Sequence, residues 1–460
     1  MPGASGQVVV IGGGVSGLSA AYDLTQAGVQ CTVLEKQPRL GGVIETRCWQ
    51  NCVLECGPDS FLSAKPDALA LIKELGLESE VIGSNDQQRT TYILRRGRLV
   101  PMPDGVMMIV PTKAAPILKS RLLSWPTKIR MGLEFFRRPG YSPDRSVAEF
   151  VADHFGEETL DYLAEPLLSG IYGGDPRELS VASVLPRFLQ MEAKHGSLVR
   201  GALRSRATEP STGSIFLTLK SGLGKLIERL AAGLTVVHKE VETVERREGG
   251  GFRVRADGGW MEAAHVVLAC PAWAAARLLA GTDAEIARWL GGIRYSSSLT
   301  LSLVYQASEF DGLRAGFGFL VPKRERQRLA ACTFAATKFP HRAPEDRIIL
   351  RCFFGGTGDE AVLGESVESL VAIARDELRR VLGLTAEPVF HTVARWPESM
   401  AQYNVGHAAR VQQIEARAAV LPGLHLAGNA FRGIGIPDCV RTGRQAAADF
   451  LTLRTHKRDD

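Results

Sequence analysis

The first thirty-five residues carry the pattern that most narrows what this chain can fold into. An apolar run at residues 8–11 predicts a buried strand, and Gly12, Gly14 and Gly17 follow it. An acid, Glu35, ends a second apolar run eighteen residues after Gly17. In a strand–turn–helix such glycines allow the tight turn, the close approach of a pyrophosphate and the packing of helix on strand. The pattern therefore predicts a β-α-β unit that binds a dinucleotide.

The acid and the segment behind it narrow the choice of dinucleotide. The carboxylate of Glu35 can bind both ribose hydroxyls and repels a 2′-phosphate, which favours FAD or NAD over NADP. The helix expected at residues 16–27 directs its N-terminal amides at the phosphates. Arg39 with Gly41 and Gly42 follows the acid, and this second glycine pair resembles the extended FAD motif of glutathione-reductase-like flavoproteins. FAD is the predicted cofactor.

Composition limits the other function classes. A chain of 460 residues can form about two or three domains. The net charge of +5 comes from scattered Lys and Arg, so we expect no nucleic-acid partner and favour an anionic substrate or an acidic membrane surface. The nucleotide strand begins within seven residues of the start, and no apolar run reaches the length of a membrane span. We expect a cytoplasmic protein, with peripheral membrane contact as an alternative.

The cysteines and histidines predict little chemistry. Eight cysteines without regular pairing indicate reduced thiols. Cys48, Cys52 and Cys56 lie four apart in an expected hairpin, and without a close Cys or His pair they are interpreted as small buried side chains. No metal site is predicted. His195 and His391 are not proposed as catalytic bases.

A second glycine-rich loop lies near the C-terminus. Residues 428–438 follow a buried strand at 424–428 and open a helix expected at 438–451. Pro437 suits the first turn of a helix, and Asp438 favours its positive end. This helix is expected to direct its N-terminus at the flavin ring, where a helix dipole stabilises the negative charge of a reduced flavin near N1 and C2=O.

Several segments together resemble one family, the oxygen-dependent protoporphyrinogen/coproporphyrinogen oxidases of haem synthesis. The likeness covers nearly the whole chain, and its most specific parts are residues 57–62 and 169–175. The closest likeness is to the soluble type of Gram-positive bacteria, which prefers coproporphyrinogen III. The segments that carry it are residues 8–18, Glu35, 39–42, 55–62, 165–175, 395–403 and 433–439.

The resemblance implies a fold class and an arrangement of domains. The expected class is α/β, with a Rossmann-like FAD-binding domain of the glutathione-reductase and monoamine-oxidase type, an interleaved α+β substrate domain and a helical insertion of the membrane type. The predicted pieces are 1–90, 215–296 and 395–460 for FAD binding, 91–214 for the insertion and 297–394 for the substrate domain.

The resemblance also implies an activity. Non-covalent FAD would support the six-electron oxidation of a porphyrinogen, either coproporphyrinogen III to coproporphyrin III or protoporphyrinogen IX to protoporphyrin IX. Each of three hydrides would pass to flavin N5, and dioxygen would reoxidise the flavin to give hydrogen peroxide. Transient contact with haem-pathway enzymes and a monomeric or homodimeric state stay open. The cofactor carries the chemistry, so no acid–base dyad is predicted.

The family's motifs place the site residues. Five positions are assigned to substrate: the Gly170 carbonyl at the pyrrole edge, Leu320, Thr333 and Phe353 as clamps of the macrocycle, and Lys65 as a propionate partner. The remaining assignments are to the cofactor: Gly12, Gly14, Val15, Ser16, Gly17, Glu35, Lys36, Arg39, Gly41, Gly42, Gly57, Pro58, Asp59, Ser60, Val241, Trp396, Gly428, Asn429, Gly435, Ile436 and Pro437.

One position departs from the plant and animal protoporphyrinogen oxidases. Where those enzymes use an arginine to bind a propionate, this chain has Thr91, and Arg89 and Arg95 are displaced by two and four positions. Together with Lys65, this departure tilts the prediction towards coproporphyrinogen III. It also predicts weak inhibition by diphenyl-ether herbicides.

Other interpretations stay open. Residues 102–110 are apolar and could line a porphyrin entrance or touch a membrane, although burial against neighbouring helices is favoured. A flavin amine oxidase or a carotenoid desaturase could use the same scaffold, but Asn429 with Phe431 is a poor match for an amine oxidase's aromatic cage. A non-enzymatic relative of the GDP-dissociation inhibitors is disfavoured by the intact glycine motifs.

Overall fold

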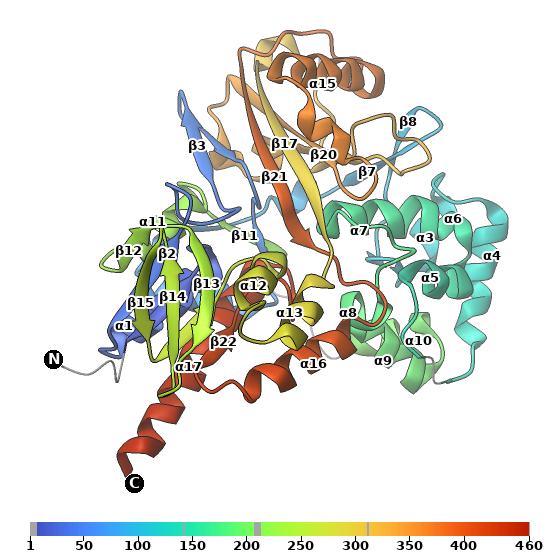
Figure 1. Cartoon of the computed structure of the whole chain (residues 1–460). Coiled ribbons are helices and arrows are strands. Elements are labelled where there is room, and N and C mark those ends of the chain that lie inside the picture. The colour runs from blue at the N-terminus through green and yellow to red at the C-terminus, as the bar shows by residue number, and fades with distance from the viewer. Residues whose placement is uncertain (1–6, 141–142, 207–212, 311, 460) are drawn as a thin grey trace.

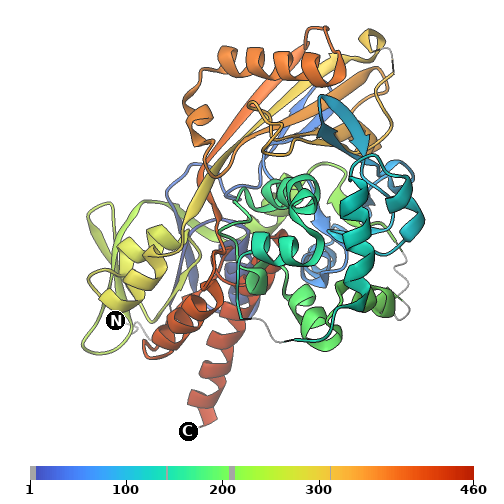
Figure 2. The same cartoon turned by 90° about the vertical axis from the view of Figure 1, so that its right-hand side faces the viewer.

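The computed structural model describes residues 7–140, 143–206, 213–310 and 312–459. Figure 1 shows three parts: a five-stranded sheet with its helices, a seven-stranded sheet that carries helix α15 (Val367–Leu382), and a group of helices that lies beside both. Figure 2 gives the view from the side of these helices.

The five-stranded sheet is parallel throughout. The chain moves from β1 to β2 on one side and returns later to β16 and β22 on the other, so the carboxyl end of β1 is a topological switch point. Ligands of open α/β sheets bind at such points. The strands in spatial order are β12 (Thr235–His238), β2 (Cys31–Glu35), β1 (Val8–Ile11), β16 (His265–Leu268) and β22 (Leu424–Leu426).

Helices from both ends of the chain pack against this sheet. Helix α1 (Val15–Gln26) confirms the predicted first helix. Helix α17 (Ile436–Asp459) begins before the predicted residue 438 and ends after the predicted residue 451. The two helices touch so closely that a Cβ at Gly443 would lie 2.1 Å from the carbonyl oxygen of Ser16. Helices α2 (Pro66–Glu74) and α11 (Gly224–Ala231) complete this layer, with short strands β5 (Phe61–Leu62), β6 (Val81–Gly83) and β11 (Phe216–Leu219) beside them.

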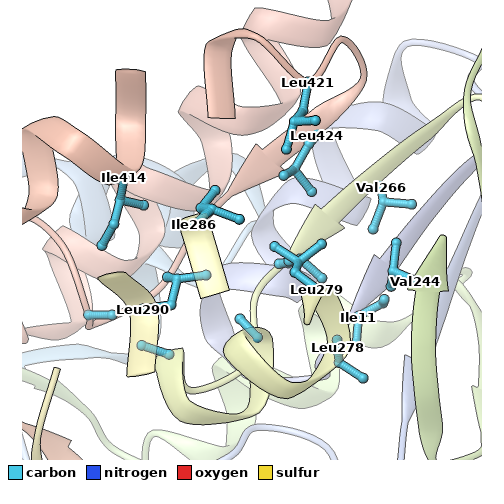
Figure 3. Packing of buried hydrophobic residues seen from close by; sticks show 14 of the residues in the cluster. Ile11, Val244, Val266, Leu278, Leu279, Ile286, Leu290, Ile414, Leu421 and Leu424 are labelled. Atoms are coloured by element: carbon cyan, nitrogen blue, oxygen red, sulfur yellow. The ribbon is translucent and has the colours of Figure 1, made fainter. Parts of the chain in front are cut away.

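The other face of the parallel sheet carries its own core. Figure 3 shows Leu279, Ile286 and Leu290 in one apolar cluster with Val266 of β16 and Leu424 of β22. Burial of such side chains stabilises the fold by about 1.5–3 kcal/mol each. The elements around this core are α12 (Ala272–Leu279), α13 (Ala284–Gly291), α16 (His407–Ala419) and an antiparallel sheet of β13 (Val241–Arg246), β14 (Phe252–Ala256) and β15 (Gly259–Ala263).

The seven-stranded sheet joins segments from distant parts of the sequence. The predicted hairpin at 91–100 is confirmed. Through the parallel pairing of β7 with β18, it joins a sheet whose other strands come from residue 295 onwards. The spatial order is β21 (Phe390–Ala401), β17 (Tyr295–Gln306), β20 (Arg347–Gly355), β19 (Ala331–Phe334), β18 (Gly318–Leu320), β7 (Thr91–Arg95) and β8 (Arg98–Pro101).

The two faces of this sheet differ in character. Leu301, Leu350 and Phe354 are buried in the cluster that helix α15 covers. The alternate residues, among them Thr300 and Arg351, point to the opposite face because side chains alternate along a strand. One face of the sheet is therefore an apolar core, and the other carries polar and aromatic groups.

The group of helices falls within the predicted insertion. A buried network holds it together: Glu134 accepts hydrogen bonds from the Leu198 amide at 2.7 Å and the Ser197 hydroxyl at 2.8 Å, and lies 2.8 Å from Nδ1 of His154. Over the described ranges, no helix is both long and apolar enough to cross a bilayer. The helices are α3 (Ala114–Lys119), α4 (Trp125–Leu133), α5 (Val147–Phe155), α6 (Glu157–Thr159), α7 (Glu165–Tyr172), α8 (Val181–Val184), α9 (Pro186–His195) and α10 (Leu198–Arg206).

Two smaller predictions hold only in part. In the hairpin of β3 (Thr46–Trp49) and β4 (Cys52–Glu55), Cys52 is buried and so is Cys56 just beyond, but Cys48 is exposed. In the apolar stretch 102–110, Ile109 and Val110 are buried, whereas the Met107 and Met108 side chains are 36% exposed. The prediction of burial is therefore confirmed for the end of that stretch and wrong for its middle.

Candidate active site

The first glycine turn forms a cradle at the carboxyl end of β1. A Cβ at Gly17 would lie 2.0 Å from the carbonyl oxygen of Gly12, and one at Gly12 would lie 2.7 Å from that of Ala269. At Gly14 a Cβ would meet nothing within 4 Å. Two of the glycines are therefore required by protein packing, and the third leaves open space at the start of α1. A pyrophosphate fits this arrangement, because the helix N-terminus offers free amides.

Glu35 is held where the second strand ends. Its Oε2 accepts a hydrogen bond from the Gly13 amide at 2.7 Å, and its Oε1 accepts one from the Gln37 amide at 2.8 Å. These bonds fix the carboxylate beside the glycine turn. A carboxylate retains further lone pairs, so Glu35 in this position can also accept ribose hydroxyls.

The remaining predicted residues of this part surround the turn. Val15 and Ser16 form the buried first turn of α1. The Lys36 ammonium lies 5.8 Å from the centre of the Trp273 ring. Val241 opens β13 just after the Lys239 amide, which donates to the Glu35 carbonyl at 3.1 Å.

The second glycine pair meets the first. Gly41 forms a parallel bridge with Gly14, and a Cβ at Gly42 would lie 3.5 Å from the Gly14 Cα. The Arg39 guanidinium lies 5.9 Å from the centre of the Trp396 ring. Five predicted cofactor residues thus lie together, and Trp396 brings in strand β21 of the seven-stranded sheet.

Residues 57–60 are fastened to the seven-stranded sheet by cations. The Arg351 guanidinium donates to the carbonyl of Gly57, and the Lys338 ammonium donates to Oδ1 of Asp59 at 3.0 Å. The Ser60 hydroxyl donates to the same carboxylate at 2.7 Å. Burial alone would raise the pKa of Asp59, but Lys338 and Arg351 hold it well below its usual range. Asp59 is therefore an anion, and this segment is rigidly placed.

The sequence analysis did not predict the roles of Arg351 and Lys338, nor that of a third buried cation, Arg342. Arg342 pairs with Glu55 at 2.9 Å, and both side chains are only 2% exposed. Burial raises the pKa of Glu55, an effect that Arg342 opposes. A usable signal did exist, because Arg351 interrupts a strand of otherwise buried apolar residues and arginine is almost never buried without a partner.

The second glycine loop leads into α17, and one of its amides is bonded to a side chain of the helix itself. The Gly435 amide donates to Oδ2 of Asp438 at 3.3 Å, just before α17 begins with Ile436 and Pro437. The same Oδ2 accepts a hydrogen bond from the Lys65 ammonium at 2.6 Å. Lys65, predicted as a propionate partner, is therefore held in an ion pair at this helix start.

The earlier part of the loop is fixed by neighbouring side chains. The Gly428 amide donates to Oγ1 of Thr442 at 3.1 Å, and Nδ2 of Asn429 donates to the Ser399 carbonyl at 3.0 Å. The Tyr403 hydroxyl donates to the Asn429 carbonyl at 2.8 Å. The predicted cofactor residues Gly428 and Asn429 thus lie on a braced loop at the carboxyl end of β22.

The predicted substrate residues share one face of the seven-stranded sheet. Ala331 pairs with both Leu320 and Phe353, and Thr333, two residues further on, pairs with Arg351. Directly paired residues of neighbouring strands project to the same face. The structure therefore brings Leu320, Thr333 and Phe353 together on the face opposite α15, and all three are partly exposed.

Gly170 lies against this face. It belongs to α7, and a Cβ built on it would lie 3.8 Å from Cδ2 of Leu320. The Ile171 side chain beside it is 47% exposed. Helix α7 ends at Gly173, whose backbone is left-handed with φ 58°. The α7 backbone and this face of the sheet therefore meet at Gly170 and Leu320, and we call the region between them, which includes Phe353, the slot.

A small pocket opens beside the end of α7. Within it Arg326 pairs with Glu165 at 3.1 Å and Lys323 pairs with Asp175 at 3.3 Å. Burial raises the pKa of Glu165 despite the nearby guanidinium. The charges here are balanced in pairs, so the pocket is polar but has little net charge. Its walls come from residues 165–176, 323–330 and 355–357.

One of the two arginines near Thr91 already has a partner elsewhere. Thr91 pairs with Gly318, next to the predicted clamp residues. Arg95 is committed elsewhere, since it pairs with Glu158 at 2.6 Å and lies 4.8 Å from the centre of the Tyr162 ring. Arg89, the other arginine, is exposed.

The cradle, the acid and the double glycine contact together fit FAD. A model of flavin-containing amine oxidoreductases matches residues 15–451. The chain belongs to this family. It is an FAD-dependent oxidoreductase, which confirms the predicted cofactor, enzyme class and fold class. In such enzymes the bound FAD accepts a hydride from the substrate, and the protein supplies position and electrostatics.

Curated relatives are similar over the full length. A coproporphyrinogen III oxidase of Bacillus subtilis is 35% identical over 97% of this chain and 98% of its own. The chloroplastic protoporphyrinogen oxidase of Nicotiana tabacum is 26% identical over 99% of this chain and 88% of its own. Among solved structures, a protoporphyrinogen oxidase candidate from Exiguobacterium sp. 255-15 has a TM-score of 0.87 and 31% identity, covering 97% of this chain and 98% of its own. The predicted family resemblance is confirmed.

Proposed function

We propose that this chain oxidises coproporphyrinogen III to coproporphyrin III in haem synthesis, with protoporphyrinogen IX as the alternative substrate. The reaction removes six hydrogens and consumes three dioxygen molecules, which leave as three molecules of hydrogen peroxide. The full-length likeness to a coproporphyrinogen III oxidase supports this assignment.

One structural observation carries the proposal: the two-faced sheet opposite α7. Leu320 and Phe353 offer apolar contact on one side of the slot, and the Gly170 backbone lies on the other. A flat macrocycle needs such an apolar slot, in which an aromatic ring can stack on it. We assign to Arg351 and Lys338 the fixing of residues 57–60, which would orient substrate and cofactor relative to each other.

The propionates would be bound by cations at the slot's edge. Coproporphyrinogen carries four propionates, so it needs more such contacts than protoporphyrinogen. We assign one to Lys65, whose resting partner is Asp438. Because Thr91 cannot supply a charge, we expect no arginine contact of the plant kind on the opposite side.

An amine oxidase is the second candidate on this scaffold, and the loop geometry disfavours it. Phe431 packs into the core cluster that lies under the loop, where only 9% of the residue is exposed. The Tyr403 ring stacks on His407 with centroids 4.0 Å apart, and its hydroxyl accepts from the Gly433 amide. Neither ring is free to form a cage for an amine.

Anaerobic reduction of the FAD-loaded protein tests the proposal. Coproporphyrinogen III and protoporphyrinogen IX are added in parallel, with a primary amine as the control substrate. We expect coproporphyrinogen III to bleach the flavin band fastest, and porphyrin fluorescence and peroxide to appear when air is admitted. Bleaching by the amine alone would overturn the proposal.

A further inference from the structure

The two walls of the slot come from distant parts of the chain. Gly170 lies on α7, and Leu320 is the last residue of β18. Within the described residues, no main-chain hydrogen bond joins residues 160–176 to residues 318–330. The direct connections between the two walls are therefore made by side chains.

The guanidinium of Arg326 connects the two walls. Arg326 lies in the loop between β18 and β19, and its side chain is only 8% exposed. Its Nε and Nη2 donate to the carbonyl oxygen of Val321, at 3.3 and 3.1 Å, and Val321 directly follows Leu320. Its Nη2 also lies 3.3 Å from the hydroxyl oxygen of Ser169, which directly precedes Gly170. One side chain thus contacts the sequence neighbour of each wall residue.

Glu165, the first residue of α7, holds this guanidinium in place. Its Oε1 accepts a hydrogen bond from Nη2 of Arg326 at 3.1 Å, and its Oε2 accepts one from the Lys323 amide at 2.9 Å. The Glu165 side chain is also only 8% exposed. The pair resists separation, because removing one partner would leave an unpaired charge in the protein interior.

The other ion pairs of this loop lie at the surface. Arg324 pairs with Asp161 at 2.8 Å and Lys323 pairs with Asp175 at 3.3 Å, but the two cationic side chains are 54% and 53% exposed. Exposed ion pairs contribute little, because water and salt screen them. The buried pair of Arg326 with Glu165 is therefore the contact that fixes the loop against α7.

The far end of α7 has separate attachments. Nε2 of Gln402 donates to the Tyr172 carbonyl at 2.7 Å, and the Thr357 amide donates to the Gly173 carbonyl at 2.8 Å. Neither contact involves Arg326. Loss of the Arg326 side chain should therefore loosen the beginning of α7 while the end of the helix stays attached.

We propose that Arg326 is a positioning residue for the oxidation, which fixes the separation of Gly170 and Leu320 and so holds the porphyrinogen in one orientation. It acts through Ser169 and Val321. This inference rests on the proposed function, because it assigns the slot to a porphyrinogen. Misplacing a bound substrate by about 1 Å can lower the rate about a hundredfold. The apolar contacts of the slot would persist, so we expect a lower kcat rather than a higher KM.

Steady-state kinetics of Arg326→Gln test the inference, with whichever porphyrinogen the wild type oxidises. We expect kcat to fall by about tenfold or more, with KM within about twofold of the wild type and the FAD content unchanged. Arg324→Gln is the matched control, because Arg324 lies in the same loop and pairs with Asp161 at the surface. The control should keep the kcat of the wild type.

Arg326→Lys separates positioning from simple charge pairing. An ammonium can pair with Glu165, but it lacks the planar fork that contacts Val321 and Ser169 together. We expect this variant to regain the melting temperature of the FAD-loaded wild type without regaining its kcat. Full kcat in Arg326→Lys, or in Arg326→Gln, would overturn the inference.

Hydrogen exchange of the FAD-loaded protein without substrate tests the connection of the two walls by itself. Mass spectrometry follows the amides of residues 160–173, which should exchange faster in Arg326→Gln and at the wild-type rate in Arg324→Gln. A wild type that oxidised no porphyrinogen would end the proposed function and leave this measurement standing. Unchanged exchange in Arg326→Gln would instead refute the role of Arg326, whatever the substrate.

Discussion

The two sheets of this molecule contribute to the candidate active site in different ways, one through main chain and the other through side chains. At the parallel sheet, the cradle is made by main chain at strand ends, where Gly12 and Gly17 leave no room for a side chain. At the seven-stranded sheet, the slot is made by side chains of one face, such as Leu320 and Phe353. Gly12 and Gly17 in the cofactor half therefore accept no side chain, whereas the partly exposed Leu320 and Phe353 in the substrate half can be replaced without loss of the fold.

This difference explains how one scaffold serves several oxidases. The putrescine oxidase of known structure, 20% identical to this chain, shares the fold with a TM-score of 0.72. A backbone-built cradle depends on a few glycines and places little constraint on the rest of the sequence. Side chains on a sheet face can be exchanged, and specificity is then set by them.

The largest effect should come from the backbone half. Gly17→Ala places a Cβ 2.0 Å from the Gly12 carbonyl, so helix and strand must separate. We expect complete loss of bound FAD, measured by the absorbance of the purified protein. Gly281→Ala is the control, because a Cβ there meets nothing within 4 Å. A Gly17→Ala protein that kept its flavin would break the comparison.

Acid pH should lower the stability of the cofactor half of the molecule. His407 is buried, and this burial lowers its pKa to about 4. Its Nε2 lies 3.2 Å from the Phe431 carbonyl of the glycine loop. The unfolded chain takes up this proton near pH 6.5 and the folded chain only near 4, so stability is lost as pH falls between these values, by about 3 kcal/mol.

Urea unfolding at pH 7 and pH 4.5, with flavin fluorescence as the readout, measures this loss. His407→Gln should remove its share of the pH dependence, because Gln does not titrate. His391→Gln, which removes an exposed histidine of β21, is the control. Identical acid sensitivity of wild type and His407→Gln would contradict the assignment.

Two adjacent phenylalanines sharpen the comparison within the other sheet. Phe353 lies on the slot face and Phe354 on the face that α15 covers. Phe353→Ala should lower kcat/KM for coproporphyrinogen III roughly thirtyfold, which corresponds to a loss of about 2 kcal/mol of transition-state stabilisation, with little change in the free energy of unfolding. Phe354→Ala should instead lower the free energy of unfolding by about 3–5 kcal/mol. The opposite outcome would reverse the assigned faces.

The smallest effect is expected where the two halves meet. Lys65 and Asp438 form an ion pair whose lysine side chain is 44% exposed. If Lys65 binds a propionate, Lys65→Met should raise KM for coproporphyrinogen III by a factor of about five, and Asp438→Asn should lower it by releasing the lysine. Lys225→Met, at a side chain that is 45% exposed, is the control. A rise in KM for both variants would assign the pair a structural role.

The sequence predicted the cradle well because its signal is local. Glycines, a strand and an acid within thirty-five residues suffice to place Gly12, Gly17 and Glu35, and their contacts agree with those roles. The slot could be placed only through family likeness. Leu320 and Phe353 are thirty-three residues apart, and their common face depends on the register of three strands that no short pattern reveals.

Charge partners were the least predictable feature. The pairing of Arg342 with Glu55 joins residues nearly three hundred positions apart, and Lys65 meets Asp438 across most of the chain. Neither contact has a local pattern, because an ion pair needs only proximity. The burial of Arg351 could have been suspected from its strand, but its bond to Gly57 could not.

The order in which the parallel sheet is assembled has a consequence for how the enzyme is made. Strand β1 gains its neighbour β16 only when residue 268 has been synthesised, and β22 and α17 come from the last forty residues. The edge of β1 therefore stays uncovered on the ribosome for more than half of translation, and the edge of β16 then waits for β22. The second glycine loop and α17 belong to the same late segment, so the predicted FAD site is complete only after every other part of the fold has been synthesised.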